Sequence, residues 1–571
     1  MHQRGYLKMK MHLLKECVKV ELEGTPLPSD VMLLEPFHFN RKRTIYYFSR
    51  HKLPEVLQVF NKPVDKLPPQ VKAVYDDELN KRELIKALKT YGPKQNPVVN
   101  EHLTLRPHQQ LAREVAQIYD RFAFYYDTRT GKTPLSIAIM YDDIKKHPDH
   151  KWLVVAPLVL LELAWAEDIK KFIPDIPTVV CHAKTKAKRL ELIKQEANIY
   201  ILNTESFVNY IEYFDGVTRL ILDESSSMKN KSSKFSKAIV EFSRTCDRLY
   251  LLSGTPAPNG AWEYYRQIQA IDYYGIQQSF AQFKNKYFLN LARDVRFEDL
   301  ILRPDMADEL RELVGQYAIY VDKEDVLETP GRSFIEHKLT LPDDLKEQYK
   351  RMKKDLYATV GEDTDILAPS AAAKLNKLNQ ITSGFLIDTA AKQENDLAKK
   401  RGDAAPAKQE VYLLNDYRFK ALLELLSTLH NEQVIIWANY HEEFKQISRL
   451  LGEDCVTVYG KTPAYQKIRN IQAFKQGEVK YLVANPASAD KGLTLTNCHI
   501  CIYFSLNWSY EEFRQSMERI YGDKSIQPYE CIYYIFEAKG TVDEVIYNDV
   551  LVNKQEISYA ILNHLKADDY E

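Results

Sequence analysis

Short apolar runs alternate with longer amphipathic stretches along the chain from about residue 105 onward. Strands that are apolar throughout and separated by helical stretches are typical of a parallel sheet covered by helices on both faces. The pattern therefore predicts an α/β lobe, with ligands bound at the carboxyl ends of its strands. Its predicted strands are 122–126, 152–157, 198–203, 218–224 and 248–254.

A second series of the same kind follows after a region where the pattern weakens. That region has helical periodicity at 261–274 and 342–360, and a polar, charged stretch at 388–410 that we interpret as a mobile loop or linker. The sequence thus predicts two parallel-sheet α/β lobes in tandem. The predicted strands of the second lobe are 433–439, 454–460, 479–486, 499–505 and 529–537.

The first hundred residues have a different character. Residues 17–24 and 43–50 have the pattern of strands, and 76–92 has apolar positions at helical spacing. Proline-rich segments at 61–70 and 91–99 interrupt this part and indicate a boundary near residue 97. We predict a small α+β accessory domain, and we divide the chain into 1–97, 98–335 and 336–571.

Composition narrows the class of protein. The chain has 571 residues, 45% hydrophobic and 27% charged, which is typical of a multidomain globular protein. Lys plus Arg number 78 and Asp plus Glu 79, so any nucleic-acid surface must be a local groove. No apolar run reaches the roughly 18 residues that span a bilayer. We expect a soluble protein of the cytoplasm, in a bacterial cell or a phage-infected host.

The seven cysteines do not suggest a disulfide framework. Cys498 and Cys501 have CxxC spacing, but no second pair lies nearby, and the segment has the pattern of a buried strand. We therefore interpret the thiols as reduced and disfavour a zinc or redox role for this pair.

The strongest chemical signal is Gly131-Lys132-Thr133, between a predicted strand and a predicted helix. In a phosphate-binding loop the backbone N–H groups and the helix N-terminus face the phosphates. Lys132 would reach the β and γ oxygens, and the Thr133 hydroxyl would ligate Mg²⁺. The match is partial, because Tyr126 stands where the strict pattern asks for glycine, and Arg129 adds a bulky cation two residues before Gly131.

A pair of acids could provide the metal ligand and the general base that hydrolysis of a nucleoside triphosphate needs. The apolar strand 218–224 ends in Asp223-Glu224. Asp223 would hold Mg²⁺ through its water shell, and Glu224 would orient and deprotonate the attacking water. A third strand follows and ends in the small polar residues of 253–259, which could couple the site to a neighbouring lobe.

In order and spacing these segments resemble superfamily 2 helicase-like motors, and specifically Swi/Snf-type DNA translocases in a compact bacteriophage or bacterial form. The resemblance covers about residues 103–550 and implies two RecA-like lobes. Residues 105–109 resemble the adenine-reading element, with Gln109 in that role, and 152–172 resemble motif Ia. Residues 223–230 match the DExHxxKN pattern with Ser226 in place of His, and 253–259 match the Ser–Gly–Thr–Pro–x–x–Asn motif.

The second lobe follows the family order as well. Ser488, Gly492 and Leu493 stand for motif V, and Trp508 for the tryptophan before the final helix. Gln515 and Arg519 match motif VI, but residue 522, where the family has a second arginine, is glycine. Such arginines can contribute roughly 10³–10⁵ in rate in related systems. Arg519 is the candidate finger, and Arg514 and Lys524 are weaker substitutes.

The resemblance implies Mg²⁺-ATP as the bound nucleotide and DNA as the track. We predict catalytic roles for Lys132, Asp223, Glu224 and Arg519. Mg²⁺ ligation is predicted for Thr133 and Asp223. ATP binding is predicted for Gln109, Arg129, Thr130, Gly131, Lys132, Thr133, Gln515 and Arg519. Sequence-independent nucleic-acid contacts are predicted for Thr204, Ser206, Ser488, Gly492, Thr494 and Trp508.

The leading hypothesis is an ATP-dependent translocase or helicase that moves on or remodels duplex or branched DNA, in replication, recombination or repair. One alternative is an RNA helicase of the same superfamily. Gly522 keeps a second alternative open, a nucleotide-gated DNA-binding scaffold with weak ATPase activity.

Overall fold

A computed structural model describes most of the chain. The described residues are 9–22, 38–39, 45–60, 62–276, 279–290, 300–355, 357–360, 364–367, 371–388, 410–430, 432–488 and 494–552. Two compact units result, Met1–Val326 and Leu327–Glu556. The predicted linker at 388–410 lies almost wholly outside the described residues. Among the described residues, no helix has the length and apolar character needed to cross a bilayer.

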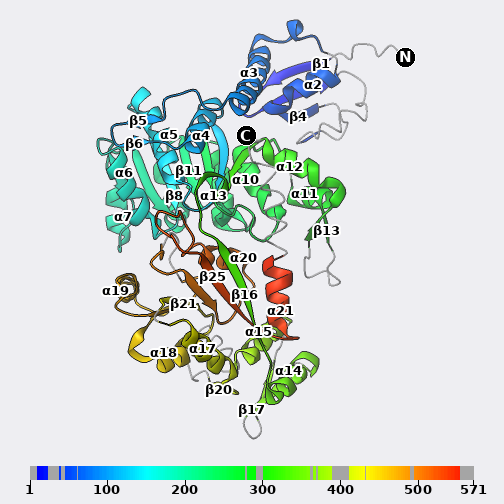
Figure 1. The fold of residues 1–571 in the computed structure, drawn as a ribbon. Helices are drawn as coiled ribbons and strands as arrows, with labels where there is room; N and C mark the ends of the chain where they lie inside the picture. The colour runs from blue at the N-terminus through cyan, green and yellow to red at the C-terminus, as the bar shows by residue number, and fades with distance from the viewer. Residues whose placement is uncertain are drawn as a thin grey trace. The chain divides into compact units, whose positions relative to one another are not determined.

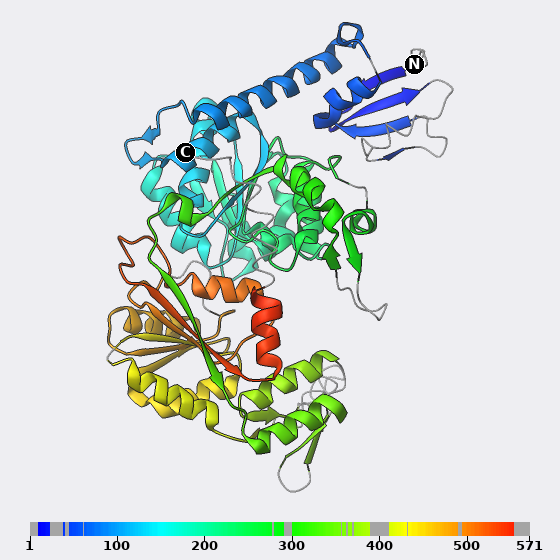
Figure 2. The same cartoon turned by 45° about the vertical axis from the view of Figure 1, so that its right-hand side comes forward.

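The N-terminal module is an antiparallel sheet of order β1-β2-β4-β3 with two helices (Figure 2), which confirms the predicted α+β character. Alternate residues of β2 are fully buried, as expected of a strand with one face on a core. Pro69 begins the long helix, because proline is favoured at the first helical position. The elements are β1 Met9–Leu13, β2 Cys17–Leu22, β3 His38–Phe39, β4 Ile45–Ser49, α2 Leu53–Val59 and α3 Pro69–Tyr91.

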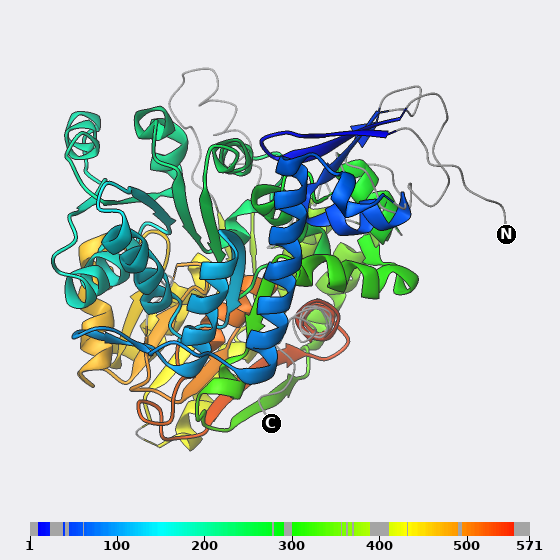
Figure 3. The ribbon, with the colours of Figure 1, turned by 90° about the horizontal axis from the view of Figure 1, so that it is seen from above.

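Helix α3 joins this module to the first lobe. Val71, near its start, belongs to the apolar core of the module, whereas Leu88, near its end, belongs to a core of the first lobe. Its C-terminal part lies beside α4, Pro107–Ile118 (Figure 3). A 23-residue helix is about 35 Å long, so one element reaches both cores.

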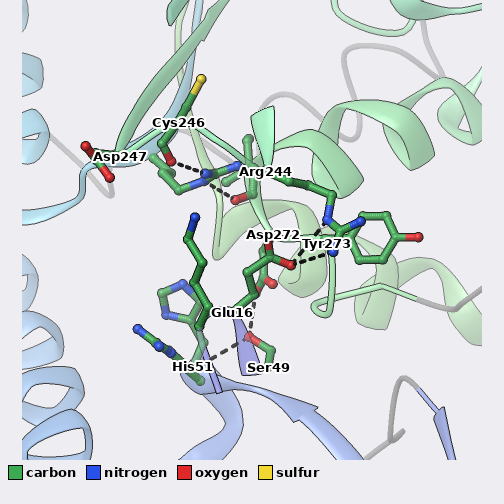
Figure 4. Close-up of a pocket in the computed structure, with 12 residues that line it drawn as sticks. Glu16, Ser49, His51, Arg244, Cys246, Asp247, Asp272 and Tyr273 are labelled. Atoms are coloured by element: carbon green, nitrogen blue, oxygen red, sulfur yellow. Dashed lines mark hydrogen bonds and ion pairs between the residues drawn. The ribbon is translucent and has the colours of Figure 1, made fainter. Parts of the chain in front are cut away.

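Module and lobe also meet through polar contacts around a cavity of about 290 Å³ (Figure 4). The Ser49 hydroxyl donates to Asp272 Oδ2 at 2.5 Å, and Tyr317 donates to the same oxygen at 2.9 Å. Arg244 pairs with Glu16 at 3.2 Å. These contacts fix the accessory module to the first lobe at the end of β4 and at the end of helix α10, Tyr264–Ile271.

The first lobe is a seven-stranded parallel sheet of order β15-β7-β12-β11-β8-β10-β9. Strand β7 shows why it is apolar throughout: Phe122, Phe124 and Tyr126 enter one core and Ala123 and Tyr125 the other. The predicted strands are confirmed, and the edge strands β9 and β15 are additional. Strands of this unit are β5 Val98–Asn100, β6 Leu103–Thr104, β7 Arg121–Tyr126, β8 Trp152–Ala156, β9 Thr178–Val180, β10 Ile199–Asn203, β11 Arg219–Asp223, β12 Arg248–Leu252, β13 Phe288–Asn290, β14 Leu300–Leu302 and β15 Ala318–Val321.

Helices cover both faces of this sheet, as the continuous apolar strands predict. Helices α4 and α5 contribute to the core that contains Phe124, and α8, α9 and α10 to the core that contains Tyr125. The helices after α4 are α5 Lys132–Lys146, α6 Glu167–Phe172, α7 Lys186–Ile193, α8 Thr204–Tyr210, α9 Lys234–Ser243, α10 Tyr264–Ile271, α11 Phe280–Tyr287, α12 Ala307–Gly315 and α13 Lys323–Val326.

The second lobe is a six-stranded parallel sheet of order β16-β25-β24-β21-β23-β22 (Figure 1), which completes the predicted tandem of parallel-sheet lobes. Strand β16 was not predicted and spans the proposed 335/336 boundary. Most of its residues are exposed or half-buried at the sheet edge, so it has no continuous apolar signal. The strands are β16 Arg332–Leu339, β21 Val434–Trp437, β22 Cys455–Val458, β23 Tyr481–Ala484, β24 Ile500–Tyr503 and β25 Cys531–Ala538.

One helix prediction in this unit is wrong at its end. Helix α14 covers Asp343–Asp355, but Tyr357–Val360 pairs antiparallel with Thr364–Leu367 as a hairpin. The β-branched and aromatic residues of 357–360 favour a strand over a helix. The remaining elements are β17 Tyr357–Val360, β18 Thr364–Leu367, α15 Ala371–Thr382, β19 Phe385–Ile387, β20 Val411–Leu413, α17 Tyr417–Thr428, α18 His441–Leu451, α19 Ala464–Lys475, α20 Tyr510–Met517 and α21 Val542–Glu544.

Candidate nucleotide-hydrolysis site

The loop between β7 and α5 has the backbone shape of a phosphate-binding turn. Gly131 precedes α5 in the left-handed region, with φ 86°, and Arg129 also has a left-handed φ of 65°. A Cβ at position 131 would lie 1.9 Å from Gln109 Nε2, so a larger residue would have to displace that side-chain amide, and the left-handed φ itself favours glycine. The glycine requirement therefore comes from both backbone conformation and a close neighbour.

The loop is closed by its own polar groups. Lys132 Nζ donates to the carbonyl oxygens of Tyr126 at 2.9 Å and Asp127 at 3.3 Å. The Thr130 hydroxyl is buried and donates to the Asp127 carbonyl at 2.7 Å, and the Thr130 N–H donates to the same carbonyl at 3.4 Å. Thr133 follows Lys132 in the first turn of α5 and is half-buried.

Helix α4 braces the loop from its first turn. Gln109 Nε2 donates to the carbonyl oxygens of Thr130 at 3.1 Å and Gly131 at 3.2 Å. The His108 Nε2–H donates to the Thr130 carbonyl at 2.8 Å, and burial lowers the pKa of His108. The predicted adenine reader thus lies against the phosphate loop, with its amide engaged by loop carbonyls.

Asp223 and Glu224 end β11 beside this loop. Asp223 is buried, and its Oδ1 and Oδ2 accept from the Glu224 N–H at 3.0 Å and from Trp165 Nε1 at 2.9 Å. Burial, followed by repulsion from Glu224, raises the pKa of Asp223 to about 6, while Lys132 opposes the shift. The structure therefore brings the predicted lysine and acids into electrostatic contact.

Glu224 also connects to the third strand. It has a left-handed φ of 54°, and Ser253 Oγ donates to its Oε2 at 3.5 Å. The contact exists because β11 and β12 are parallel neighbours, with Asp223 opposite Leu252. The first residue of the predicted coupling segment 253–259 thus contacts Glu224, the predicted general base.

The predicted DNA contacts of the first lobe differ in exposure. Asn203 caps α8 by accepting from the Ser206 N–H at 3.2 Å. Ser206 is 1% exposed, so its hydroxyl does not face solvent, and its assignment as a phosphate contact is not supported by the structure. Thr204 is half-buried at the carboxyl end of β10 and remains a candidate.

The second unit carries the remaining predicted residues on and around α20. Gln515 Nε2 donates to Glu511 Oε1 at 3.4 Å, and Arg519, just after the helix, is buried. The Leu495 N–H donates to the Arg519 carbonyl at 2.8 Å. Ser488, Thr494 and Trp508 are half-buried, and Gly492 lies outside the described residues.

The CxxC pair lies at β24 in the same unit. Cys498 and Cys501 are both buried in the apolar core. Burial raises the pKa of Cys498 to about 12 and that of Cys501 well above its ordinary value. Both thiols are therefore held protonated, as expected of buried strand residues.

Family models match both lobes. The SNF2-related domain matches residues 122–394, and the helicase conserved C-terminal domain matches residues 417–522. This chain belongs to the SNF2-related helicase-like ATPases. The predicted resemblance to Swi/Snf-type motors of superfamily 2 is thereby confirmed.

Relatives of this SNF2-related ATPase include phage and animal proteins. Protein p41 of Acyrthosiphon pisum secondary endosymbiont phage 1 is 23% identical over 78% of this chain and 95% of its own length. The SWI/SNF-related matrix-associated actin-dependent regulator of chromatin subfamily A-like protein 1 of Drosophila melanogaster is 24% identical, over 75% of this chain and 52% of its own length. This chain thus spans about half of that animal relative. The Sulfolobus solfataricus SWI2/SNF2 ATPase core in complex with double-stranded DNA is 18% identical, covers 83% of this chain and 98% of its own, and has a TM-score of 0.37.

Three residues at the site of this SNF2-related ATPase were missed by sequence reasoning. Lys323, 1% exposed, donates to Thr128 Oγ1 at 3.1 Å and lies 3.9 Å from Asp127 Oδ2. It follows β15, the edge strand that pairs with β7 and was not predicted. Trp165 and Gln267 are the other two. The sequence did contain a pattern that could have identified Lys323, because in 318–323 a charged pair directly follows a short apolar run, as it does at the end of a buried strand.

Proposed function

We propose that this SNF2-related ATPase is an ATP-dependent motor that moves on or remodels duplex or branched DNA, independent of sequence, in replication, recombination or repair. The observation that carries the proposal is Lys132 beside Asp223-Glu224 at the carboxyl edge of a parallel sheet, in a chain whose two lobes match SNF2-related and helicase models. A further relative, from Mus musculus, is the DNA repair and recombination protein RAD54B, 21% identical over 74% of this chain. The SNF2-related match favours DNA over the RNA alternative.

The donor set fits a magnesium nucleotide. Carboxylate and hydroxyl oxygens suit Mg²⁺, and the Asp223 carboxylate and Thr133 hydroxyl would hold it. Mg²⁺, when bound, would neutralise phosphate charge. Lys132 would exchange the loop carbonyls of Tyr126 and Asp127 for phosphate oxygens, while the loop amides bind the rest.

In this proposal Glu224 is the general base that accepts a proton from the attacking water. Its Oε2 would take the proton of the attacking water, and Ser253, donating to the same oxygen, would orient it. For Gln515 and Arg519 of the second lobe we keep the roles that the family resemblance implies, ATP binding for both and catalysis for Arg519. Burial raises the pKa of Asp223, and the charge of a bound Mg²⁺ would favour the ionised carboxylate that ligation requires.

The DNA track and the setting are part of the same proposal. Thr204, Ser488, Thr494 and Trp508 would contact the phosphate backbone or bases at strand ends, without reading sequence. The accessory domain would be 1–97, and because β16 (Arg332–Leu339) belongs to the sheet of the second lobe, the boundary between the lobes would lie before Arg332 and not at 335/336. A phage relative supports a bacterial or phage-infected cytoplasm as the location.

The proposal is tested by steady-state phosphate release with single-stranded, duplex, forked and four-way DNA, and with single-stranded RNA. We expect duplex-containing DNA to stimulate hydrolysis. Lys132→Ala should lower stimulated kcat by about 100-fold or more, because the charge at the phosphates is lost. Lys146→Ala, which removes an exposed lysine from the last turn of the same helix, is the control and should leave kcat unchanged. Stimulation by RNA alone, or no stimulated turnover, would overturn the proposal.

A further inference from the structure

A buried tryptophan contacts the carboxylate that would bind the metal. Trp165 is 0% exposed, and its indole N–H donates to Asp223 Oδ2 at 2.9 Å. We infer that Trp165 is a positioning residue, which holds the Asp223 carboxylate in the orientation that Mg²⁺ binding needs. The inference rests on the proposed function, because it takes Asp223 as a metal ligand.

The two donors to Asp223 fix the plane of its carboxylate. Oδ2 accepts from the indole, and Oδ1 accepts from the Glu224 N–H at 3.0 Å. Each oxygen keeps a lone pair for the metal or its water, since a carboxylate can accept about four hydrogen bonds. An indole N–H donates and never accepts, so it cannot compete for the cation.

The backbone that carries Trp165 is unusual. Leu161–Ala166 is a π-helical turn that precedes α6 in the segment after β8. Turns of π-helix are rare in proteins as a whole, and those that occur are often found at functional sites. Strands β8 and β11 are parallel neighbours, with Val155 opposite Leu222, so the segment after β8 reaches the end of β11. The π-turn thus places the indole beside the carboxylate.

The chain contains a matched pair of residues away from the nucleotide site. Trp152, at the start of β8, is also fully buried, and its Nε1 donates to Asp143 Oδ2 at 3.0 Å. Asp143 is buried as well, and it pairs with Arg219 and His150. The two tryptophans therefore make the same kind of bond, Trp152 from the start of β8 and Trp165 from the π-turn that follows the strand, and of the two only Trp165 touches a predicted metal ligand.

The test compares Trp165→Phe with Trp152→Phe. Affinity for ADP is measured by titration calorimetry with Mg²⁺ and with EDTA, and the Mg²⁺ concentration for half-maximal ATPase is measured separately. Groups that orient metal ligands typically contribute 10–100-fold to metal affinity. For Trp165→Phe we expect the gain in ADP affinity from Mg²⁺ to fall by about 10-fold or more, with affinity in EDTA unchanged. Trp152→Phe should keep the full Mg²⁺ gain.

Loss of packing alone should affect both phenylalanine variants alike, so a wild-type Mg²⁺ gain in Trp165→Phe, or an equal loss in Trp152→Phe, overturns the inference. Trp165→His, which keeps a ring N–H, is the second variant, and its Mg²⁺ gain should exceed that of Trp165→Phe. If Trp165→Phe does not fold, a folded Trp165→His with no Mg²⁺ gain overturns the inference instead. The ADP measurement does not need turnover, so failure of the proposed function and failure of this inference are distinguishable.

Discussion

Arg129 occupies a backbone conformation that costs free energy. Its φ is 65°, a left-handed value that disfavours any residue with a Cβ by about 1–2 kcal/mol. Helicase-like motors usually have glycine at this position, and the backbone here explains why glycine suits it. The arginine keeps the loop conformation that glycine would adopt more readily, and it does so at this cost in free energy. We propose that its guanidinium supplies positive charge at the phosphates.

Arg129→Gly separates the backbone from the charge. Relief of strain should raise the free energy of unfolding by about 0.5–1 kcal/mol, as measured by denaturant titration. The charge role predicts a lower kcat in the same variant, and unchanged kcat would exclude that role. Gly131→Ala is the opposite control, because its Cβ would meet Gln109 Nε2 at 1.9 Å, and it should destabilise the protein.

Helix α10 ties the three nucleotide segments of the first lobe together through one side chain. Gln267 is fully buried, and its Oε1 accepts from Ser225 at 2.7 Å and from Tyr125 at 3.1 Å. Its Nε2 donates to the Pro256 carbonyl at 2.7 Å. Tyr125 precedes the phosphate loop, Ser225 follows the acids, and Pro256 lies in the coupling segment. One amide thus fixes the spacing of all three.

Gln267→Leu keeps the volume and removes these bonds. Because buried polar groups would lose their partners, we expect the free energy of unfolding to fall by about 2–4 kcal/mol. A double-mutant cycle with Ser225→Ala should give a coupling energy of about 1 kcal/mol. Gln117→Leu, on the exposed side of α4, should change stability by less than about 0.5 kcal/mol. Additive effects of Gln267 and Ser225 would contradict this account.

At the scale of the whole molecule, the accessory module and the first lobe form one compact unit. Helix α3 contributes to both cores, and Asp272 accepts from Ser49 of the module and Tyr317 of the lobe. The pKa of Tyr317 lies well above its ordinary value, mainly because the side chain is buried and next because Asp272 repels the charged form. The Tyr317 hydroxyl therefore stays protonated and donates its hydrogen bond to Asp272. We therefore expect module and lobe to unfold together.

Asp272→Ala removes the acceptor that both partners share. We expect a loss of about 2–4 kcal/mol in the free energy of unfolding, since two buried hydroxyls lose their partner. Thermal unfolding followed by tryptophan fluorescence measures it. Asp308→Ala removes an exposed surface ion pair with Arg311 and should have an effect below about 0.5 kcal/mol. Equal effects of the two variants would show that Asp272 does not anchor the module.

The sequence by itself determined the tandem of parallel-sheet lobes, the phosphate loop and the acid pair. These depend on apolar runs and short motifs, in which residues that act together are close along the chain. Strands buried on both faces are apolar throughout, so their pattern stands out. Asp223 was predicted because it is the last residue of such a strand, and Lys132 because it follows the turn after one.

Only the tertiary structure decided which strands form the sheet edges and which residues far apart in the sequence meet at the candidate site. Strands β15 and β16 were missed because one is short and the other is largely exposed at a sheet edge. Lys323 meets Thr128 across 195 residues, and Trp165 meets Asp223 across 58. No local pattern relates such pairs, because only the order of strands in the sheet makes them neighbours. The left-handed backbone at Arg129 is likewise set by the turn between β7 and α5.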